Sequence, residues 1–285
     1  MGRRHPDWLK VKMKGGKDYL EIKKILRKSN LHTICEEANC PNISECFNNK
    51  TAVFLILGDV CTRNCKYCNV KHGKPKILNK NEPEEIAKSV RILGLNYVVI
   101  TSVTRDDLED GGASFFYKTV KMIRKLNPNC KIEVLIPDFK GDYNALKKVI
   151  DSNPDVINHN IEVVEDLFCE IRPEGNYNLS LDLLKKIKTI NKYIYSKSGF
   201  MIGLGETDEQ IIKTMKDLRN SNVDFLTIGQ YLQPSLNHAK IIKYYLPSEF
   251  KKFKQFALDI GFKYVESGPL VRSSYHADKA ISEIE

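Results

Sequence analysis

The stretch TAVFLILGDVCTRNCKYCNV (residues 51–70) decides the fold of this chain, because it joins a strand directly to a group of cysteines. Its first part, TAVFLILG (51–58), is an unbroken apolar run, which is typical of a strand buried on both faces of a parallel sheet. Three cysteines follow with the spacing C-x3-C-x2-C. Active sites of parallel α/β proteins lie at the carboxyl ends of the strands, so this junction predicts an active-site loop.

Beyond this junction, apolar runs of strand length alternate with amphipathic stretches of helix length. The further expected strands are NYVVI (96–100), KIEVLI (131–136), DVINHNIE (155–162), GFMIGL (199–204) and DFLTIG (224–229). The expected helices cover residues 83–93, 113–126, 143–150, 179–190, 208–220 and 248–260. Six strand-then-helix units with short connections predict an α/β fold with helices outside a parallel sheet. Six units are too few for a closed eight-fold barrel, so a partial (β/α)6 barrel of the TIM type or a doubly wound sheet fits the count.

Two further segments flank this α/β unit, which we expect to cover residues 51–265. Residues 1–50 are mostly polar, with a short helical stretch near 19–28 followed by three cysteines, and they predict an N-terminal extension. Residues 266–285 begin ESGPLVRSSYHADKA and have no helical period until their very end. We expect them to form a tail that is draped across the mouth of the barrel rather than packed into it.

The composition is that of a globular protein, with 285 residues, of which 42% are hydrophobic and 28% charged. The longest apolar run, Val53–Leu57, is far shorter than a membrane span, and the start MGRRHPDWLKVK lacks the apolar stretch of a secretory signal. We therefore expect a cytoplasmic protein without a membrane partner, or an organellar one if a transit peptide has been removed. In a reducing compartment, clustered cysteines are metal ligands more often than disulfides.

The net charge of +9 comes mostly from lysine, and the lysines are scattered along the expected helices. A solvated lysine surface explains this pattern. Attraction to acidic partners, either small acidic proteins or nucleic acid, explains it as well. Charge alone leaves both interpretations open.

Six of the eight cysteines form two triplets, and each triplet supplies one thiolate fewer than a closed metal site needs. The first triplet, spaced C-x4-C-x5-C, is Cys35, Cys40 and Cys46; the second triplet is Cys61, Cys65 and Cys68. A zinc ribbon needs another C-x2-C pair downstream, and the sequence has none. Three thiolates around a [4Fe–4S] cube leave one iron open, which predicts chemistry rather than a structural clip. For the first triplet, three ordinary loop cysteines are the alternative.

The second triplet resembles the motif of the radical S-adenosylmethionine (SAM) enzymes, because it follows a strand directly and has Tyr67 before its last cysteine. The resemblance implies one [4Fe–4S] cluster on Cys61, Cys65 and Cys68, whose open iron chelates the amino and carboxylate groups of SAM. It also implies that Tyr67 lies against the adenine of SAM. In such enzymes the cofactor supplies the radical chemistry, and the protein positions and shields it.

A narrower resemblance extends from about residue 31 to residue 277, and it is to the lipoyl synthase family. The segments that carry it are CEEANCPNISECFNNKTAVFLILGDVCTRNCKYCNV (35–70), VITSVTRDDLEDGGA (99–113), HNIE (159–162), MIGLGET (201–207) and RSSYHA (272–277). The resemblance implies a sulfurtransferase that inserts two sulfur atoms at C6 and C8 of an octanoyl chain. That chain is already amide-linked to a lysine of a lipoyl carrier domain, and each sulfur consumes one SAM. Of the two folds that fit the count of units, we expect the partial barrel.

The same resemblance implies a second [4Fe–4S] cluster, the auxiliary cluster, on Cys35, Cys40 and Cys46. Its fourth ligand is a serine of the RSSY tail, either Ser273 or Ser274, and we favour Ser274. A serine oxygen is a poor ligand for soft iron, so such a cluster is easily dismantled, which suits a sulfur donor.

The resemblance to the lipoyl synthase family also implies the partners. The octanoylated carrier is the glycine cleavage H protein or the E2 subunit of a 2-oxoacid dehydrogenase. Such carrier domains tend to be acidic, which fits a basic enzyme. The electron donor is a ferredoxin or a flavodoxin, and an iron–sulfur carrier rebuilds the auxiliary cluster.

Further candidates for binding SAM lie near the expected fourth and fifth strands. The resemblance assigns the region of Asn160, Glu162 and Arg172 to the ribose and carboxylate of SAM, while a hydrogen-bonded rim uses such residues too. Gly203 and Gly205 of GLGE bring backbone amides close to the cofactor, or they form a strand-to-helix turn.

Three other residues have chemistry of their own but no ligand spacing. We expect His159 to be a core residue with satisfied hydrogen bonds. Cys130 and Cys169 stand alone near predicted element ends, and we expect both to be buried small residues that bind no metal.

The main rival function is that of an RNA-modifying radical SAM methylthiotransferase, which also carries two clusters and suits a basic chain. Against it, no RNA-binding module is visible beyond the expected barrel and its short tails. A zinc-binding nucleic-acid protein is a second rival, and the cysteine spacing disfavours it. We therefore expect a carrier protein as the partner, and no nucleic acid.

Overall fold

The computed structural model describes residues 5–11, 16–28, 31–48 and 52–284, and its core is a sheet of eight strands. In spatial order these are β1 (His32–Thr33), β2 (Val53–Ile56), β5 (Tyr97–Ser102), β6 (Lys131–Leu135), β7 (Val156–Asn158), β8 (Tyr195–Ile202), β9 (Phe225–Gln230) and β10 (Tyr264–Gly268). From β2 to β10 all neighbouring strands are parallel, whereas β1 pairs antiparallel with β2. A separate two-stranded sheet consists of β3 (Val60–Cys61) and β4 (Lys71–His72).

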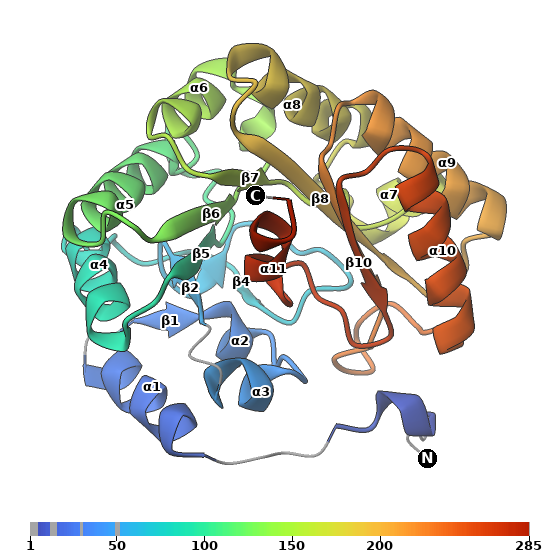
Figure 1. Ribbon diagram of the computed structural model, residues 1–285, viewed down its shortest axis with the longest axis horizontal. Coiled ribbons are helices and arrows are strands. Elements are labelled where there is room, and N and C mark those ends of the chain that lie inside the picture. Colours follow the sequence, from blue (N-terminus) through green and yellow to red (C-terminus); the bar gives the residue numbers. More distant parts are fainter. Residues whose placement is uncertain (1–4, 12–15, 29–30, 49–51, 285) are drawn as a thin grey trace.

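Helices connect the parallel strands and cover the outer face of the sheet (Figure 1). They are α4 (Glu82–Leu93), α5 (Ala113–Leu126), α6 (Tyr143–Asp151), α7 (Glu165–Ile171), α8 (Tyr177–Ile190), α9 (Asp208–Asn220) and α10 (Pro247–Asp259). The remaining helices are η1 (Asp7–Leu9), α1 (Lys17–Lys28), α2 (Ile34–Glu37), α3 (Ile43–Asn48), η2 (Phe139–Gly141) and α11 (Ala277–Ser282). In the described part of the chain, no helix is long and apolar enough to cross a membrane.

The sheet curves into part of a barrel, with α4, α5, α6, α8, α9 and α10 in an arc around it and α1, α2 and α3 near its open side (Figure 1). Among the described residues, the edge strands β1 and β10 do not pair with each other. From β2 onward, the spatial order of the strands follows the sequence, whereas a doubly wound sheet reverses its order at a switch point. The structure therefore confirms the partial (β/α)6 barrel, with β10 as an additional parallel strand.

Local sequence signals explain where several helices begin and end. The side chain of Thr207 accepts a hydrogen bond from the Gln210 amide, and the side chain of Gln210 accepts one from the Thr207 amide, which caps α9 as predicted. The last turn of α4 is followed by Gly94 in the left-handed conformation, with φ of 63°. All residues of β2 and β9 are buried, as expected for strands with covered faces.

Two strands differ in length from the expectation. β8 begins at Tyr195, four residues before the predicted GFMIGL run, because Lys197 interrupts the apolar pattern. Lys197 is fully buried within the barrel, and its ammonium group lies 3.0 Å from both carboxylate oxygens of Glu133 on β6. β7 ends at Asn158, so Asn160 and Glu162 lie in the segment after the strand.

The C-terminal tail is more packed than expected. Its first residues belong to β10, which pairs with β9, so the predicted boundary at residue 266 falls inside a strand. Ala280 and Ile281 of α11 pack in one cluster with Val156, Phe225 and Tyr264, at the amino-terminal ends of β7, β9 and β10. The tail therefore continues beyond the mouth and covers the opposite end of the barrel with α11, which lies in front of the strands in Figure 1. The apolar face of α11 explains this position.

We expect Ile281→Ala to lower the free energy of unfolding by about 2 kcal/mol, because Ile281 is buried and its truncation leaves a cavity under α11. Thermal unfolding of the purified protein measures the change in the free energy of unfolding. Lys279→Ala, at an exposed position of the same helix, is the matched control and should stay within about 0.5 kcal/mol of the wild type. Equal stability of all three proteins would show that α11 is not packed on the strands.

Candidate active site

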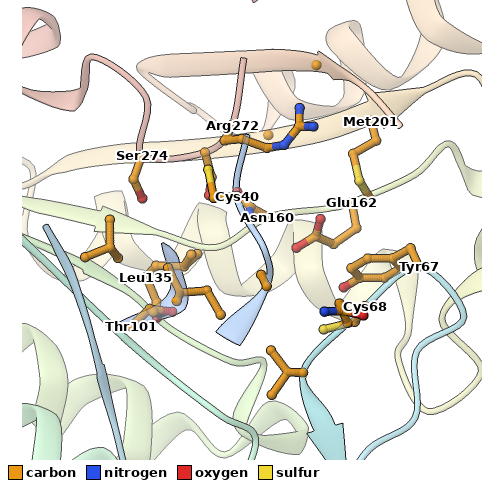
Figure 2. A pocket seen from close by; sticks show the side chains of 18 of the residues that line it. Cys40, Tyr67, Cys68, Thr101, Leu135, Asn160, Glu162, Met201, Arg272 and Ser274 are labelled. Atoms are coloured by element: carbon orange, nitrogen blue, oxygen red, sulfur yellow. Dashed lines mark hydrogen bonds between the residues drawn. The ribbon is translucent and has the colours of Figure 1, made fainter. Parts of the chain in front are cut away.

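One cavity of about 570 Å³ lies at the carboxyl ends of the parallel strands. Thr101, Leu135, Met201 and Gln230, which stand at or next to the ends of β5, β6, β8 and β9, line it. All six cysteines of the two triplets line the same cavity, and so do Ser273 and Ser274 of the tail. Figure 2 shows Cys40 and Ser274 on one side of this space and Tyr67, Cys68 and Glu162 on the other. The structure thus brings together residues that are far apart in the sequence.

The loop that carries the second triplet is held by backbone hydrogen bonds. The amide of Lys66 donates to the carbonyl of Ile171 at 2.9 Å, and the amide of Cys68 donates to the carbonyl of Cys65 at 3.1 Å. The ring of His238 contacts the carbonyl of Cys68 at 3.0 Å. Because contacts from α7 and from the segment after β9 converge on this loop, its cysteines are placed before any ligand binds.

Arg63, within the second-triplet motif, ties the loop to neighbouring strand ends. Its guanidinium group is almost fully buried and donates two hydrogen bonds to Asp106, at 2.7 and 3.0 Å, and two to Asp138, at 2.6 and 2.7 Å. Burial alone raises the pKa of Asp138, but the hydrogen bonds and charge of Arg63 outweigh it and lower this pKa to about 2. Asp106 and Asp138 follow β5 and β6, so one side chain joins three loops at the mouth of the barrel.

The predicted SAM-binding residues Asn160, Glu162 and Arg172 line the cavity, and so does Tyr67. Arg172 donates a hydrogen bond to the carbonyl of Asn160 at 3.1 Å. Burial raises the pKa of Glu162, and Arg172 together with hydrogen bonds from Asn160 and Tyr67 opposes this rise. The side-chain oxygen of Asn160 is buried without a hydrogen-bond partner among the described residues. A buried, unpartnered acceptor in a cavity wall fits a ligand that brings a donor.

Helices α2 and α3 position the first triplet. The amide of Cys40 donates to the carbonyl of Cys35 at 3.0 Å, and the amide of Cys46 donates to the carbonyl of Asn42 at 2.9 Å. Cys35 is buried in the core, whereas Cys40 and Cys46 are half-buried at the cavity. The arrangement differs from that of three unrelated loop cysteines, because all three sulfur-bearing residues line one space.

The tail is fixed to the first triplet on both sides of Ser274. The side-chain amide of Asn42 donates to the carbonyl of Leu270 at 2.7 Å, and the hydroxyl of Tyr275 donates to Glu45 at 3.1 Å. Ser274 itself is 9% exposed and lines the cavity, while Ser273 is half-buried there. Residues next to Cys40 and Cys46 thus hold Ser274 at the cavity that both cysteines line.

Two strand glycines that sequence reasoning did not single out make room for this arrangement. A Cβ atom on Gly229 of β9 would lie 2.2 Å from the carbonyl oxygen of Val271, so only glycine lets the tail cross the strand this closely. A Cβ atom on Gly199 of β8 would lie 2.1 Å from the hydroxyl of Thr227, inside the cavity wall. Glycines inside predicted strands were the available signal for both contacts.

Burial opposes the ionisation of several thiols of the two triplets. Burial, with smaller effects of neighbouring groups, raises the pKa of Cys65 to about 11 and that of Cys46 and Cys68 to about 12. In the described residues, no three His, Cys, Asp or Glu side chains converge tightly enough for a single metal ion. A [4Fe–4S] cube binds each thiolate through a different iron, so its ligands do not have to meet at one point. Either triplet could hold such a cube and would release protons on binding it.

Gly203 and Gly205 do not line the cavity, which differs from the cofactor contact expected for them. The amide of Gly203 donates to the side chain of Glu206 at 2.5 Å, and its carbonyl accepts from the amide of Ile242 at 2.8 Å. Both glycines have a positive φ, of 113° and 115°. The structure therefore favours the strand-to-helix turn, in which these glycines serve the backbone conformation.

The residues predicted to have no ligand role divide into two groups. His159 is buried, and its ring contacts the carbonyl of Ile136 at 2.9 Å and the hydroxyl of Ser180 at 3.0 Å, as expected of a satisfied core histidine. Cys130 is buried as predicted. The prediction for Cys169 was wrong, because this thiol is exposed on the short helix α7.

These features define the class of the protein. Residues 55–218, more than half of the chain, match the model of the Radical SAM superfamily. The fold agrees with solved structures of Streptococcus suis SuiB bound to S-adenosylmethionine (TM-score 0.59, 12% identity, 79% of this chain and 53% of that chain) and of methylornithine synthase PylB (TM-score 0.52, 13% identity, 87% and 81%). The chain thus spans about half the length of SuiB, and these two likenesses support the fold alone. The chain is a radical SAM protein.

The particular family follows from closer relatives. Residues 2–40 match the N-terminal domain of lipoyl synthase of the Radical SAM family. The chain is 54% identical over 280 residues to lipoyl synthase of Caldicellulosiruptor bescii, covering 98% of this chain and 96% of that protein. It is 53% identical over 283 residues to lipoyl synthase of Halalkalibacterium halodurans, covering 99% and 93%. The chain belongs to the lipoyl synthase family.

We expect Arg63→Met to destabilise the protein by about 3 kcal/mol, because buried Asp138 loses both hydrogen bonds from Arg63 and retains the longer ion pair with Arg172, at 3.7 Å. Thermal unfolding of the reconstituted enzyme measures this loss. The pKa of Asp138 is lowered in the folded state, so the contribution of this carboxylate is present at neutral pH and is lost as the pH falls from about 4 toward 2. Lys140→Met is the control, since this exposed lysine lies 3.9 Å from Asp106 and should contribute below about 1 kcal/mol. Similar melting of both variants would argue against the Arg63 network.

Proposed function

We propose that this enzyme inserts sulfur at C6 and C8 of an octanoyl group that is bound to a lysine of a carrier domain. The chain is an enzyme of the radical SAM lipoyl synthase family. The observation that carries the proposal for its own residues is that both cysteine triplets line one cavity. An unactivated methylene has no acidic hydrogen, so a side-chain base cannot start the reaction. A SAM-bound iron–sulfur cluster supplies the radical that abstracts such a hydrogen, and sulfur must then be close at hand.

In this proposal, Cys61, Cys65 and Cys68 hold the cluster that binds SAM. Their number leaves one iron open, and the fixed loop around Arg63 supports the placement of the three thiolates. Tyr67, Asn160, Glu162 and Arg172 form the wall beside them and bind SAM. The unpartnered side-chain oxygen of Asn160 supports this assignment, because it lies buried in that wall and accepts a hydrogen bond from no described residue.

Cys35, Cys40, Cys46 and Ser274 hold the auxiliary cluster, which is the source of sulfur. The two tail contacts, from Asn42 to Leu270 and from Tyr275 to Glu45, support the choice of Ser274. Ser274 is also more deeply buried than Ser273. A hydroxyl oxygen binds iron weakly in comparison with a thiolate, so a cluster with this ligand can be dismantled during the reaction.

The rest of the cavity suits a hydrocarbon chain between the two clusters. Apolar side chains that line it are Val53, Val103, Leu135, Met201, Tyr231 and Val271. They bind the octanoyl chain by excluding water, and the same exclusion protects a carbon radical from side reactions.

The partners follow from the same chemistry. The carrier is the octanoylated glycine cleavage H protein or the E2 subunit of a 2-oxoacid dehydrogenase. A ferredoxin or flavodoxin supplies electrons, and an iron–sulfur carrier restores the auxiliary cluster. We place the enzyme in a reducing compartment such as the cytoplasm, because both triplets must stay reduced to bind iron. The RNA-modifying methylthiotransferase is not favoured, because the relatives that cover nearly the whole chain are lipoyl synthases.

The functional assay separates the two triplets. The anaerobically reconstituted enzyme should hold about eight irons per chain. With reductant and SAM, it should add two sulfur atoms to an octanoyl-lysine peptide, as measured by mass spectrometry. Replacing any cysteine of the second triplet with alanine should abolish SAM cleavage. Replacing any cysteine of the first triplet should leave SAM cleavage intact and stop sulfur insertion.

Two results would contradict these roles. If alanine variants of both triplets lost SAM cleavage equally while each kept its other cluster, the division of labour would be wrong. If the wild type cleaved SAM but transferred no sulfur to the peptide, the proposed reaction would be wrong.

The tail serine is tested by a pair of substitutions. Ser274→Ala should retain SAM cleavage and lose most sulfur insertion, because the auxiliary cluster lacks its fourth ligand. Ser274→Cys should hold the cluster more firmly, as measured by iron content after incubation with a chelator, and should still make product poorly. Ser273→Ala is the matched control and should behave as the wild type. Full sulfur insertion by both Ser274 variants would show that Ser274 is not the ligand.

A further inference from the structure

The cavity opens to solvent beside a firmly held loop after β9. Among the residues that line the cavity, Asn39 and Pro234 are the exposed ones in the described part of the chain. Asn39 follows α2 in the first-triplet segment, and Pro234 belongs to the segment between β9 and α10. Any substrate that is tethered to a protein therefore enters between these two segments.

Next to this opening, one large apolar side chain is exposed to solvent. Leu236, two residues after Pro234, is 93% exposed. Its loop is not loose, because the hydroxyl of Tyr231 donates to the carbonyl of Ala239 at 2.8 Å. The amide of Ala239 donates in turn to the carbonyl of Lys66 at 2.8 Å. Because this loop is already rigid, little conformational entropy is lost when a partner covers the leucine.

The two chain segments beside this leucine carry only basic charged residues. Residues 60–81 and 225–248 contain no aspartate or glutamate, although the chain has 36 of these residues. Lys66 and Lys240 are exposed on these two runs, and neither forms an ion pair with a described residue. On the other side of the opening, Glu36 and Glu37 are engaged by Lys23 and His32. The unpaired lysines on the β9 side of the opening are therefore positive, and the exposed Glu174, which accepts a hydrogen bond from the amide of Asn64 at 3.3 Å, adds one negative charge beside the Lys66 loop.

We propose that the rim patch, defined as Lys66, Pro234, Leu236 and Lys240, is the docking surface for an acidic carrier domain that bears the octanoyl-lysine. This inference rests on the proposed function. The tethered chain is only a lysine side chain and eight carbons long, so the body of the carrier must lie against the opening while the chain occupies the cavity. Unpaired lysines fit carboxylates of the carrier, and Leu236 supplies an apolar contact at the centre.

The experiment compares rim variants with matched controls in the reconstituted enzyme. The variants are Leu236→Asp and Lys240→Glu; Lys66 is left unchanged because Cys65 precedes it. The controls are Ile92→Asp, at a 66% exposed position of α4, and Lys185→Glu, at an exposed position of α8. Anaerobic titration with octanoylated glycine cleavage H protein gives the Kd at low and high salt. Turnover of a short octanoyl-lysine peptide, which is too small to need the patch, reports on the catalytic centre.

Each rim variant should raise the Kd for the H protein about tenfold, and Lys240→Glu should also reduce the salt dependence of binding. The controls should bind as the wild type does, and all variants should convert the peptide at the wild-type rate. Unchanged binding by both rim variants, or an equal loss in the controls, would overturn the proposal. The proposal would also be overturned if a rim variant abolished self-association of the enzyme but left the Kd for the H protein unchanged.

Two further outcomes keep this proposal separate from the proposed function. If Leu236→Asp lost both H-protein binding and peptide turnover, the substitution would have disturbed its loop. The Kd of Lys240→Glu for the H protein would then decide whether the rim patch is the docking surface. If the wild type bound the H protein but failed to convert the peptide, the proposed function would fail. The Kd values would still show whether the rim patch contacts an acidic partner.

Discussion

The contacts of Arg63 with Asp106 and Asp138 are the constraint on which the active-site geometry depends. Parallel strands bring their carboxyl ends to one edge, but the loops beyond them are free to diverge. A single buried guanidinium group with two carboxylate partners prevents this at β2, β5 and β6. Because Arg63 lies between Cys61 and Cys65, it also fixes the loop that carries the second triplet.

The opposite wall depends on close backbone approach rather than on charge. Gly229 lets Val271 cross β9 without a side chain in between, and the tail then meets the first triplet through Asn42 and Glu45. Beyond Ser274, α11 packs on the amino-terminal ends of the strands. A segment anchored at both ends of the barrel holds its middle in place, and the middle contains the serine. Rigid strands thus place the second triplet, and an anchored tail places the weakest proposed ligand.

Charge is used differently inside and outside this molecule. Inside, ionised groups are paired: Lys197 with Glu133 in the barrel, and Arg63 with two aspartates. At the rim, Lys66 and Lys240 lie on runs of the chain without an acidic residue and form no ion pair with a described residue, so they remain available to an acidic partner. The two features have one physical origin, since a buried charge without a partner is costly and an exposed one is not. The net charge of +9 is therefore informative only after the structure shows which lysines are paired.

The sequence by itself determined the strand-then-helix order, most helix bounds and the two cysteine triplets, because periodicity, capping and ligand spacing are local properties. It determined neither β10 nor the early start of β8, since a seventh strand and a buried Lys197 become favourable only beside their neighbours. Only the tertiary structure shows that Gly203 and Gly205 lie outside the cavity lining and that the side-chain oxygen of Asn160 has no partner among the described residues. The position of Ser274 in the same cavity as the first triplet also belongs to the tertiary structure. Asn42 and Leu270, which help to join them, are 228 residues apart, and no local pattern encodes a contact over that distance.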